Sequence, residues 1–264
     1  MQDRKPGHQT RKPLKPDPGG KRNIRLTLAY DGTAYHGWQI QDDAPTLQGL
    51  LSDSIARITG ERVSVTGSGR TDAGTHARGL VANFFTSSRI EPGRLMRALN
   101  GVLPRDVRVM SARRAAPDFH ARKSAVSKIY QYRIYTGPVL PPHLLREYFH
   151  YPFPVDVEKM TQAARLFPGE HDFASFAKAN TAAVNTVRRI FRCDLQKKGR
   201  RLLLTVEGNG FLHHMVRNMA GTLLEVGRGT IGPGDFRDLF RKRDRTLAGF
   251  TAPARGLVLL KVKY

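Results

Sequence analysis

Residues 24–66 read IRLTLAYDGTAYHGWQIQDDAPTLQGLLSDSIARITGERVSVT, and the fold can be worked out from this stretch. Residues 24–30 alternate between apolar and polar side chains, a pattern that predicts a strand ending in a turn. Residues 47–58 carry apolar side chains at helical spacing, and Thr46 is placed to cap the start of that helix. Residues 63–66 predict a short second strand. The stretch therefore predicts a strand, a helix and a strand in that order.

The pattern continues on the C-terminal side of this stretch. A strand at 80–86, a helix at 92–102 opened by Pro92, and a strand at 107–115 complete the order strand, helix, strand, strand, helix, strand. A similar order follows, with strands predicted at 128–135, 187–197, 201–207 and 257–262, and helices at 156–167 (N-cap Asp156), 212–223 and 233–240. Each series is typical of a split βαβ unit, the ferredoxin-like pattern.

The sequence thus predicts an α+β protein with two ferredoxin-like halves, residues 23–116 and 117–264. The sheets are expected to be mixed and largely antiparallel, with helices on one face and an RNA-binding cleft between the halves. Residues 1–22 are rich in Pro, Gly and basic side chains and have little to bury, so we predict a flexible basic tail.

Charge is the most unusual feature of the composition. The chain has 44 Lys and Arg against 22 Asp and Glu, a formal charge of +22. A polyanion is the natural partner of such a surface, although a well-solvated cationic surface is the plain alternative. No apolar run is long enough to span a bilayer, so no membrane partner is expected. Candidate RNA contacts are Arg78, Arg113, Arg114, Arg122, Lys128, Arg188, Arg189, Arg217 and Arg228.

Cysteine usage and the N-terminus bear on compartment. Cys193 is the single cysteine, which excludes an intramolecular disulfide and a cysteine-based zinc cluster. The N-terminus lacks the apolar core of a secretory signal. We therefore expect a cytoplasmic protein.

The stretch with most chemical information is residues 67–77, GSGRTDAGTHA. Its three glycines permit a tight loop whose backbone closely approaches a ligand. It lacks the Gly-Lys-Ser/Thr ending of a Walker loop and the spacing of a dinucleotide fingerprint. Judged on the residues alone, a plain turn stabilised by an Arg70–Asp72 contact is the default interpretation.

The run RTDAGTHA at 70–77 resembles the signature loop of the pseudouridine synthases that act on transfer RNA, with Thr75 where the family usually has valine. Other segments match in order: YDGT (30–33), GWQ (37–39), FHAR (119–122), YQY (130–132), GEHDF (169–173), HMVRNM (214–219) and TAPA (251–254). Lys123 and His213 depart from the aromatic and the arginine usual in the family. The resemblance covers the chain from about residue 23 to its end.

This resemblance implies an enzyme that flips a uridine out of the anticodon stem-loop of tRNA, around nucleotides 38–40, and isomerises it to pseudouridine. It implies a homodimer that uses no metal, nucleotide or organic cofactor. The catalytic carboxylate would be Asp72. The resemblance leaves open whether Asp72 attacks the sugar, adds to the base or deprotonates C2′.

Three further residues carry substrate-binding roles by the same resemblance. Arg70 would fill the gap left by the flipped base and pair with Asp72. Tyr130 would stack on the uracil, with its hydroxyl available for proton transfer at C5, and Leu257 would form an apolar wall. Pattern alone favours a core position for both Tyr130 and Leu257.

His213 and His214 raise the question of zinc. No matching ligand spacing accompanies them, so RNA contacts at a helix end or ordinary packing is the favoured interpretation. Two other classes of protein stay open on sequence grounds. A non-catalytic RNA-binding protein would share the basic surface, and a nucleic-acid hydrolase would share the carboxylate, although a nuclease normally clusters carboxylates around Mg²⁺.

Overall fold

The computed structural model of the protein describes residues 20–179 and 185–264. Its strands are β1 (Arg22–Tyr30), β2 (Thr66–Gly67), β3 (His76–Thr86), β4 (Val107–Arg114), β5 (Ser127–Tyr135), β6 (Phe149–His150), β7 (Gly169–Asp172), β8 (Val187–Lys198), β9 (Arg201–Gly208) and β10 (Leu257–Lys263). Its helices are α1 (Leu47–Thr59), α2 (Pro92–Val102), α3 (Val157–Ala164), α4 (Met215–Arg228) and α5 (Pro233–Lys242).

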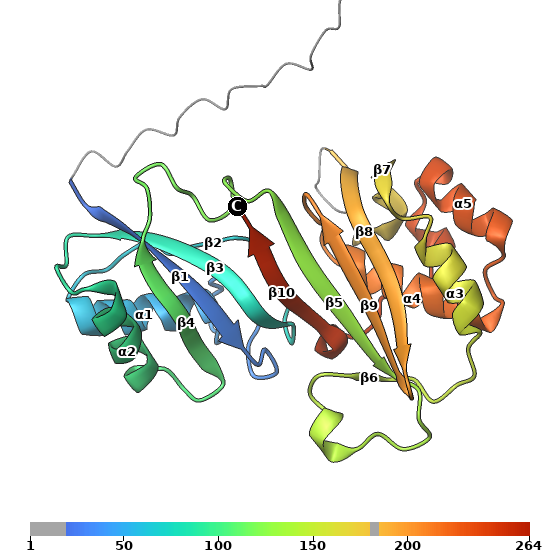
Figure 1. The fold of residues 1–264 in the computed structure, drawn as a ribbon, viewed down its shortest axis with the longest axis horizontal. Helices are drawn as coiled ribbons and strands as arrows, with labels where there is room; N and C mark the ends of the chain where they lie inside the picture. Colours follow the sequence, from blue (N-terminus) through green and yellow to red (C-terminus); the bar gives the residue numbers. More distant parts are fainter. Residues whose placement is uncertain (1–19, 180–184) are drawn as a thin grey trace, which may run out of the picture.

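All these strands belong to one sheet, in the order β4-β1-β3-β10-β5-β9-β8-β7, with β2 beside β3 and β6 beside β5 (Figure 1). Most neighbours are antiparallel, while β10 runs parallel to β3 and β6 runs parallel to β5. The predicted α+β class with a mixed, largely antiparallel arrangement is confirmed.

The last strand of the chain lies in the middle of the sheet. β10 pairs with β3 on one side, where Val258 is opposite His76, and with β5 on the other, where Leu259 is opposite Tyr130. The strands of the two predicted halves therefore continue into a single sheet. The division of the chain at residue 116 stays a prediction.

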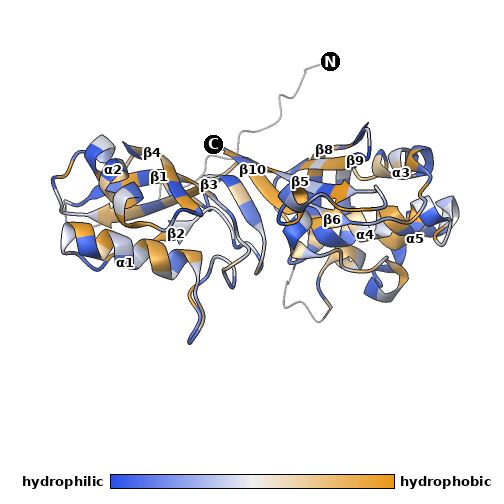
Figure 2. Ribbon diagram, turned by 90° about the horizontal axis from the view of Figure 1, so that it is seen from below, coloured by the Kyte–Doolittle hydropathy of each residue, from blue (hydrophilic) through white to orange (hydrophobic). Residues whose placement is uncertain are grey.

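Two groups of helices lie toward opposite ends of the sheet, α1 and α2 with the N-terminal strands and α3, α4 and α5 with the C-terminal ones (Figure 2). One contiguous apolar core includes fully buried side chains from both groups, such as Leu51 of α1, Leu99 of α2 and Leu223 of α4. Burial of these stripes is the main stabilising contribution to the helices.

Both predicted N-caps are present. The Thr46 hydroxyl accepts the Gly49 amide at 3.4 Å, and the Asp156 carboxylate accepts two amides of α3 at 3.0 Å. The strand predicted at 63–66 is wrong for 63–65, because only Thr66 and Gly67 pair with β3. The alternation there reflects the buried side chain of Val65, without a hydrogen-bonded ladder. β7 was not predicted, since its sequence GEHD has no apolar alternation.

Of the predicted tail, residues 1–19 lie outside the described residues. β1 begins at Arg22, one residue before the predicted start of order. Within the described part of the chain, every helix is too short or too polar to cross a bilayer.

Candidate active site

The loop between β2 and β3 is hydrogen-bonded to the segment that follows β1. The Trp38 amide donates to the Thr71 carbonyl at 3.1 Å, and the Gly74 amide donates to the Tyr35 carbonyl at 3.2 Å. Gly37 has φ 91°, and a Cβ there would lie 2.4 Å from the Thr71 oxygen. Only glycine fits this close approach. The GWQ segment, anchored by the buried Trp38, therefore fixes the backbone position of Asp72.

Thr71 turns its side chain into the protein. Its hydroxyl hydrogen-bonds the Tyr30 hydroxyl at 2.9 Å, and both residues are buried. Burial raises the pKa of Tyr30, so the phenol is neutral over the physiological range. Asp72, the next residue, is left partly exposed, with 19% of its side chain accessible.

A cation from the other half of the chain contacts Asp72. Arg217, in the first turn of α4, donates from Nη1 to Asp72 Oδ2 at 2.8 Å and from Nε to the Ala252 carbonyl at 2.7 Å. Only 14% of its side chain is exposed. The two hydrogen bonds hold the guanidinium in one orientation, so the Asp72 carboxylate faces a fixed positive charge.

Two imidazoles complete the surroundings of Asp72. His213 Nε2 lies 3.2 Å from Oδ1, and His214 Nε2 lies 3.5 Å from Oδ2. His214 is the N-cap of α4 with φ 64°, a left-handed conformation that is uncommon for a residue with a side chain. Burial lowers the pKa of His214 to about 4, against the opposing effect of Asp72, so its imidazole is neutral at pH 7.

Arg70 lies elsewhere than expected. Its side chain is exposed, and among the described residues no ion pair joins it to Asp72. The predicted Arg70–Asp72 contact is wrong, because Asp72 turns toward α4 and pairs with Arg217. An exposed Arg70 remains available to a bound polyanion.

Tyr130 and Leu257 both lie at the centre of the sheet and are buried. The Tyr130 ring packs edge-on against Phe211, with centroids 5.1 Å apart. Burial and the nearby charge of Asp72 raise the pKa of Tyr130, so its hydroxyl keeps its proton. Leu257 opens β10 opposite Tyr132. Their burial agrees with the core position that the sequence pattern favoured. Their roles toward a substrate stay predictions.

Sequence reasoning missed the partners of Asp72. Arg217 was named only as a candidate RNA contact, and His213 and His214 were assigned to RNA contacts or packing. All three contact the carboxylate instead. The HMVRNM segment that contains Arg217 was the available signal, but no local pattern pairs it with a loop so distant in sequence.

Three atoms of metal-ligand type lie close together at this carboxylate. Asp72, His213 and His214 each offer one, and these lie within 4.8 Å of one another. Spacing along the sequence favoured RNA contacts or packing for the two histidines over zinc, but the fold brings Asp72 to them from a remote loop. Arg217 opposes any cation at Oδ2, whereas Oδ1 is the oxygen that faces His213 Nε2 at 3.2 Å.

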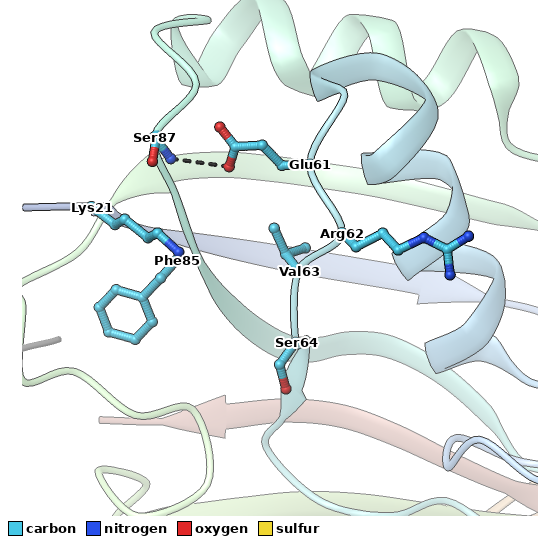
Figure 3. A pocket seen from close by; sticks show the side chains of 7 residues that line it. All are labelled: Lys21, Glu61, Arg62, Val63, Ser64, Phe85 and Ser87. Carbon is cyan, nitrogen blue, oxygen red and sulfur yellow. Dashed lines mark hydrogen bonds between the residues drawn. The ribbon is translucent and has the colours of Figure 1, made fainter. Parts of the chain in front are cut away.

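A separate pocket lies at the start of β1 and the end of β3, away from the Asp72 loop (Figure 3). Lys21, Glu61, Arg62 and Ser87 are among its lining residues. Glu61 accepts the Ser87 amide at 3.0 Å. Lys21 precedes β1 whereas Asp72 lies beyond the far end of that strand, so about 25 Å of strand separates them. The pocket is therefore distinct from the Asp72 site.

Comparison with known proteins identifies the family. A sequence model described as tRNA pseudouridine synthase matches residues 27–122 and 163–264. The chain belongs to this family. It is 45% identical over 244 residues to tRNA pseudouridine synthase A of Caldicellulosiruptor bescii, covering 92% of this chain and 100% of that protein. It is 46% identical over 245 residues to the protein of the same description from Pelobacter propionicus, with the same coverage.

Among solved structures, the archaeal box H/ACA sRNP Nop10-Cbf5 complex aligns with a TM-score of 0.36 and 13% identity. That alignment covers 76% of this chain and 43% of the other. The sequence matches confirm the predicted family and the prediction of an isomerase that modifies tRNA.

Proposed function

We propose that this tRNA pseudouridine synthase acts on uridines of the anticodon stem-loop and that Asp72 is its catalytic carboxylate. The observation that carries the proposal is the ion pair between Asp72 and Arg217. A fixed guanidinium binds Oδ2 of this carboxylate and 19% of the Asp72 side chain is exposed, so the group is held in one orientation and is still accessible to a substrate.

The reaction breaks the bond between C1′ and N1 of the uridine, rotates the freed uracil, and forms a bond between C1′ and C5. The hydrogen at C5 is lost as a proton and N1 gains one, so the reaction is an isomerisation. An anion beside the sugar is what this chemistry needs, either to attack, to deprotonate C2′ or to stabilise developing positive charge. Asp72 Oδ1 is the atom we assign to that task.

Three residues have supporting roles in this proposal. Tyr130 presents its ring to the uracil, and its protonated hydroxyl is suited to proton transfer at C5. Leu257 provides an apolar wall. Arg70, which is exposed within the loop, enters the space that the flipped base leaves in the RNA stem.

We infer that the RNA is recognised mainly through its backbone and shape, because the formal charge of +22 is spread over the chain. In this proposal the tRNA lies between halves 23–116 and 117–264 of a homodimeric, cytoplasmic enzyme. The isomerisation itself requires no metal and no organic cofactor.

The test follows tritium released to water from tRNA labelled at C5 of uridine. We expect release with the wild type and none with Asp72→Asn, which keeps the size of the side chain. Both proteins should bind tRNA in a filter assay. Binding without release by the wild type would favour the RNA-binding alternative, and free uracil in place of pseudouridine would favour a hydrolase.

A further inference from the structure

The atoms around Asp72 have the spacing of a metal site. His213 Nε2 and Asp72 Oδ1 are 3.2 Å apart, His214 Nε2 lies 3.5 Å from Oδ2, and one ligand atom of each residue lies within 4.8 Å of the others. Zinc binds imidazole nitrogen and carboxylate oxygen at about 2.0–2.2 Å in tetrahedral geometry, so two of its ligands are about 3.3 Å apart. The distance between His213 Nε2 and Oδ1 matches that edge, and the 4.8 Å limit on the other separations means that a small shift of the His214 side chain would complete the set.

The remaining features of the site leave room for an ion. Arg217 hydrogen-bonds Oδ2, which leaves Oδ1 as the available ligand atom. The side chain of His213 is 49% exposed, so an ion can reach the cluster from solvent. With three protein ligands, the fourth position of a tetrahedral ion faces outward, the open arrangement seen in accessible zinc sites.

We propose that Asp72, His213 and His214 bind one zinc-type dication, and that the bound ion inhibits the enzyme. The ion takes the lone pair of Asp72 Oδ1, the atom assigned above to the substrate sugar. It also occupies the exposed approach to that atom. The inhibition rests on the proposed role of Asp72, whereas the binding does not.

The ligand set determines which ions bind. Two imidazoles and one carboxylate favour Zn²⁺, Co²⁺ and Cu²⁺, while Mg²⁺ prefers oxygen ligands and retains its waters. The guanidinium of Arg217 repels any cation placed beside Asp72 and so weakens the site. Reversible inhibition by added Zn²⁺, and indifference to Mg²⁺, is the expected behaviour.

The binding experiment uses the full chain without tRNA, titrated with Co²⁺, whose visible absorption reports tetrahedral coordination. We expect one ion per chain, displaced by Zn²⁺. Changes outside the ligand shell already weaken metal binding about 10- to 100-fold, so loss of a ligand in His213→Gln should weaken it at least about 100-fold. His143→Gln, at an exposed histidine near β6, is the matched control and should bind as the wild type does.

Asp72→Asn provides a second variant, in which Co²⁺ binding should also be lost while circular dichroism shows a folded protein. A wild type that binds no Co²⁺, or a His213→Gln variant that binds it as tightly, would overturn the proposal. So would a loss of binding in His143→Gln equal to that in His213→Gln.

The activity experiment adds Zn²⁺ to the tritium-release assay. Release should fall as the site fills, return with EDTA, and be unaffected by Mg²⁺. A site that fills with Zn²⁺ while release continues unchanged would refute the inhibition. If the metal-free wild type releases no tritium at all, the proposed function fails, and the Co²⁺ titration still decides the binding.

Discussion

Arg217→Met tests whether the ion pair between Asp72 and Arg217, which lie in different halves of the chain, contributes to the unfolding free energy. The substitution keeps most of the apolar stem and removes two hydrogen bonds, at 2.8 Å to Asp72 and at 2.7 Å to the Ala252 carbonyl. A hydrogen bond to a charged group contributes about 1.5–3 kcal/mol. Less than a fifth of either charged side chain is exposed, so solvent replaces these bonds only in part. We expect a loss of about 3 kcal/mol of unfolding free energy.

Urea denaturation of a double-mutant cycle measures the pair itself. Asp72→Asn, Arg217→Met and the double variant should show a coupling of at least about 1.5 kcal/mol, because the two side chains contact each other directly. Arg78→Met is the matched control. Its contact with Glu147 is 3.5 Å long and both side chains are about half exposed, so its loss should be below about 0.5 kcal/mol.

Additivity would refute this reasoning. If the unfolding free energies of the single variants sum to that of the double variant within about 0.5 kcal/mol, Arg217 and Asp72 do not stabilise each other. The same conclusion would follow if Arg217→Met lowered the unfolding free energy no more than Arg78→Met does. In either case the guanidinium would not be the group that holds the Asp72 carboxylate in place.

Three further substitutions test other parts of the site. Gly37→Ala places a Cβ 2.4 Å from the Thr71 oxygen at φ 91°, and should lower the unfolding free energy measured in urea by about 2 kcal/mol and abolish most tritium release. Tyr130→Phe keeps the packing, so we expect stability within about 1 kcal/mol of the wild type but a kcat reduced about 100-fold at similar KM. Burial lowers the pKa of Lys128 to about 8, below its unfolded value near 10.5. Between these two pH values the unfolded state binds more protons than the folded state, so the unfolding free energy rises from pH 8 to pH 10.5. Lys128→Met should remove that rise and gain about 2 kcal/mol near pH 7, measured by urea denaturation across pH.

Local chemistry made much of the fold predictable. Thr46 and Asp156 were predicted as N-caps because a cap depends on residues within one helical turn. β8 and β9 were predicted as strands because each is an alternating run, and the structure pairs them as a hairpin around Gly199, whose φ is 60°. Residues 63–65 were mistaken for a strand since alternation reports side-chain burial and not ladder pairing.

Long-range contacts were harder to predict. Asp72 was selected as the candidate carboxylate because its loop carries a specific motif, but Arg217 and the two imidazoles reach it only through the fold. The motif segments around residues 214–219 and 251–254 meet at Arg217, which hydrogen-bonds Ala252. Nothing in the spacing of these residues along the chain encodes that meeting, so Arg70, the nearest basic residue in sequence, was wrongly chosen as the partner of Asp72.

The position of β10 explains how residues from both halves are held in one geometry. This strand pairs on one side with β3, where Val258 is opposite His76 just after the Asp72 loop, and on the other side with β5, where Leu259 is opposite Tyr130. The loop and Tyr130 are thus both registered against one short strand. A slip of one residue would turn every β10 side chain to the other face, so the buried Val262 between the exposed Lys261 and Lys263 opposes it. The final strand of the chain therefore sets the relation between Asp72 and Tyr130, although it contributes neither residue.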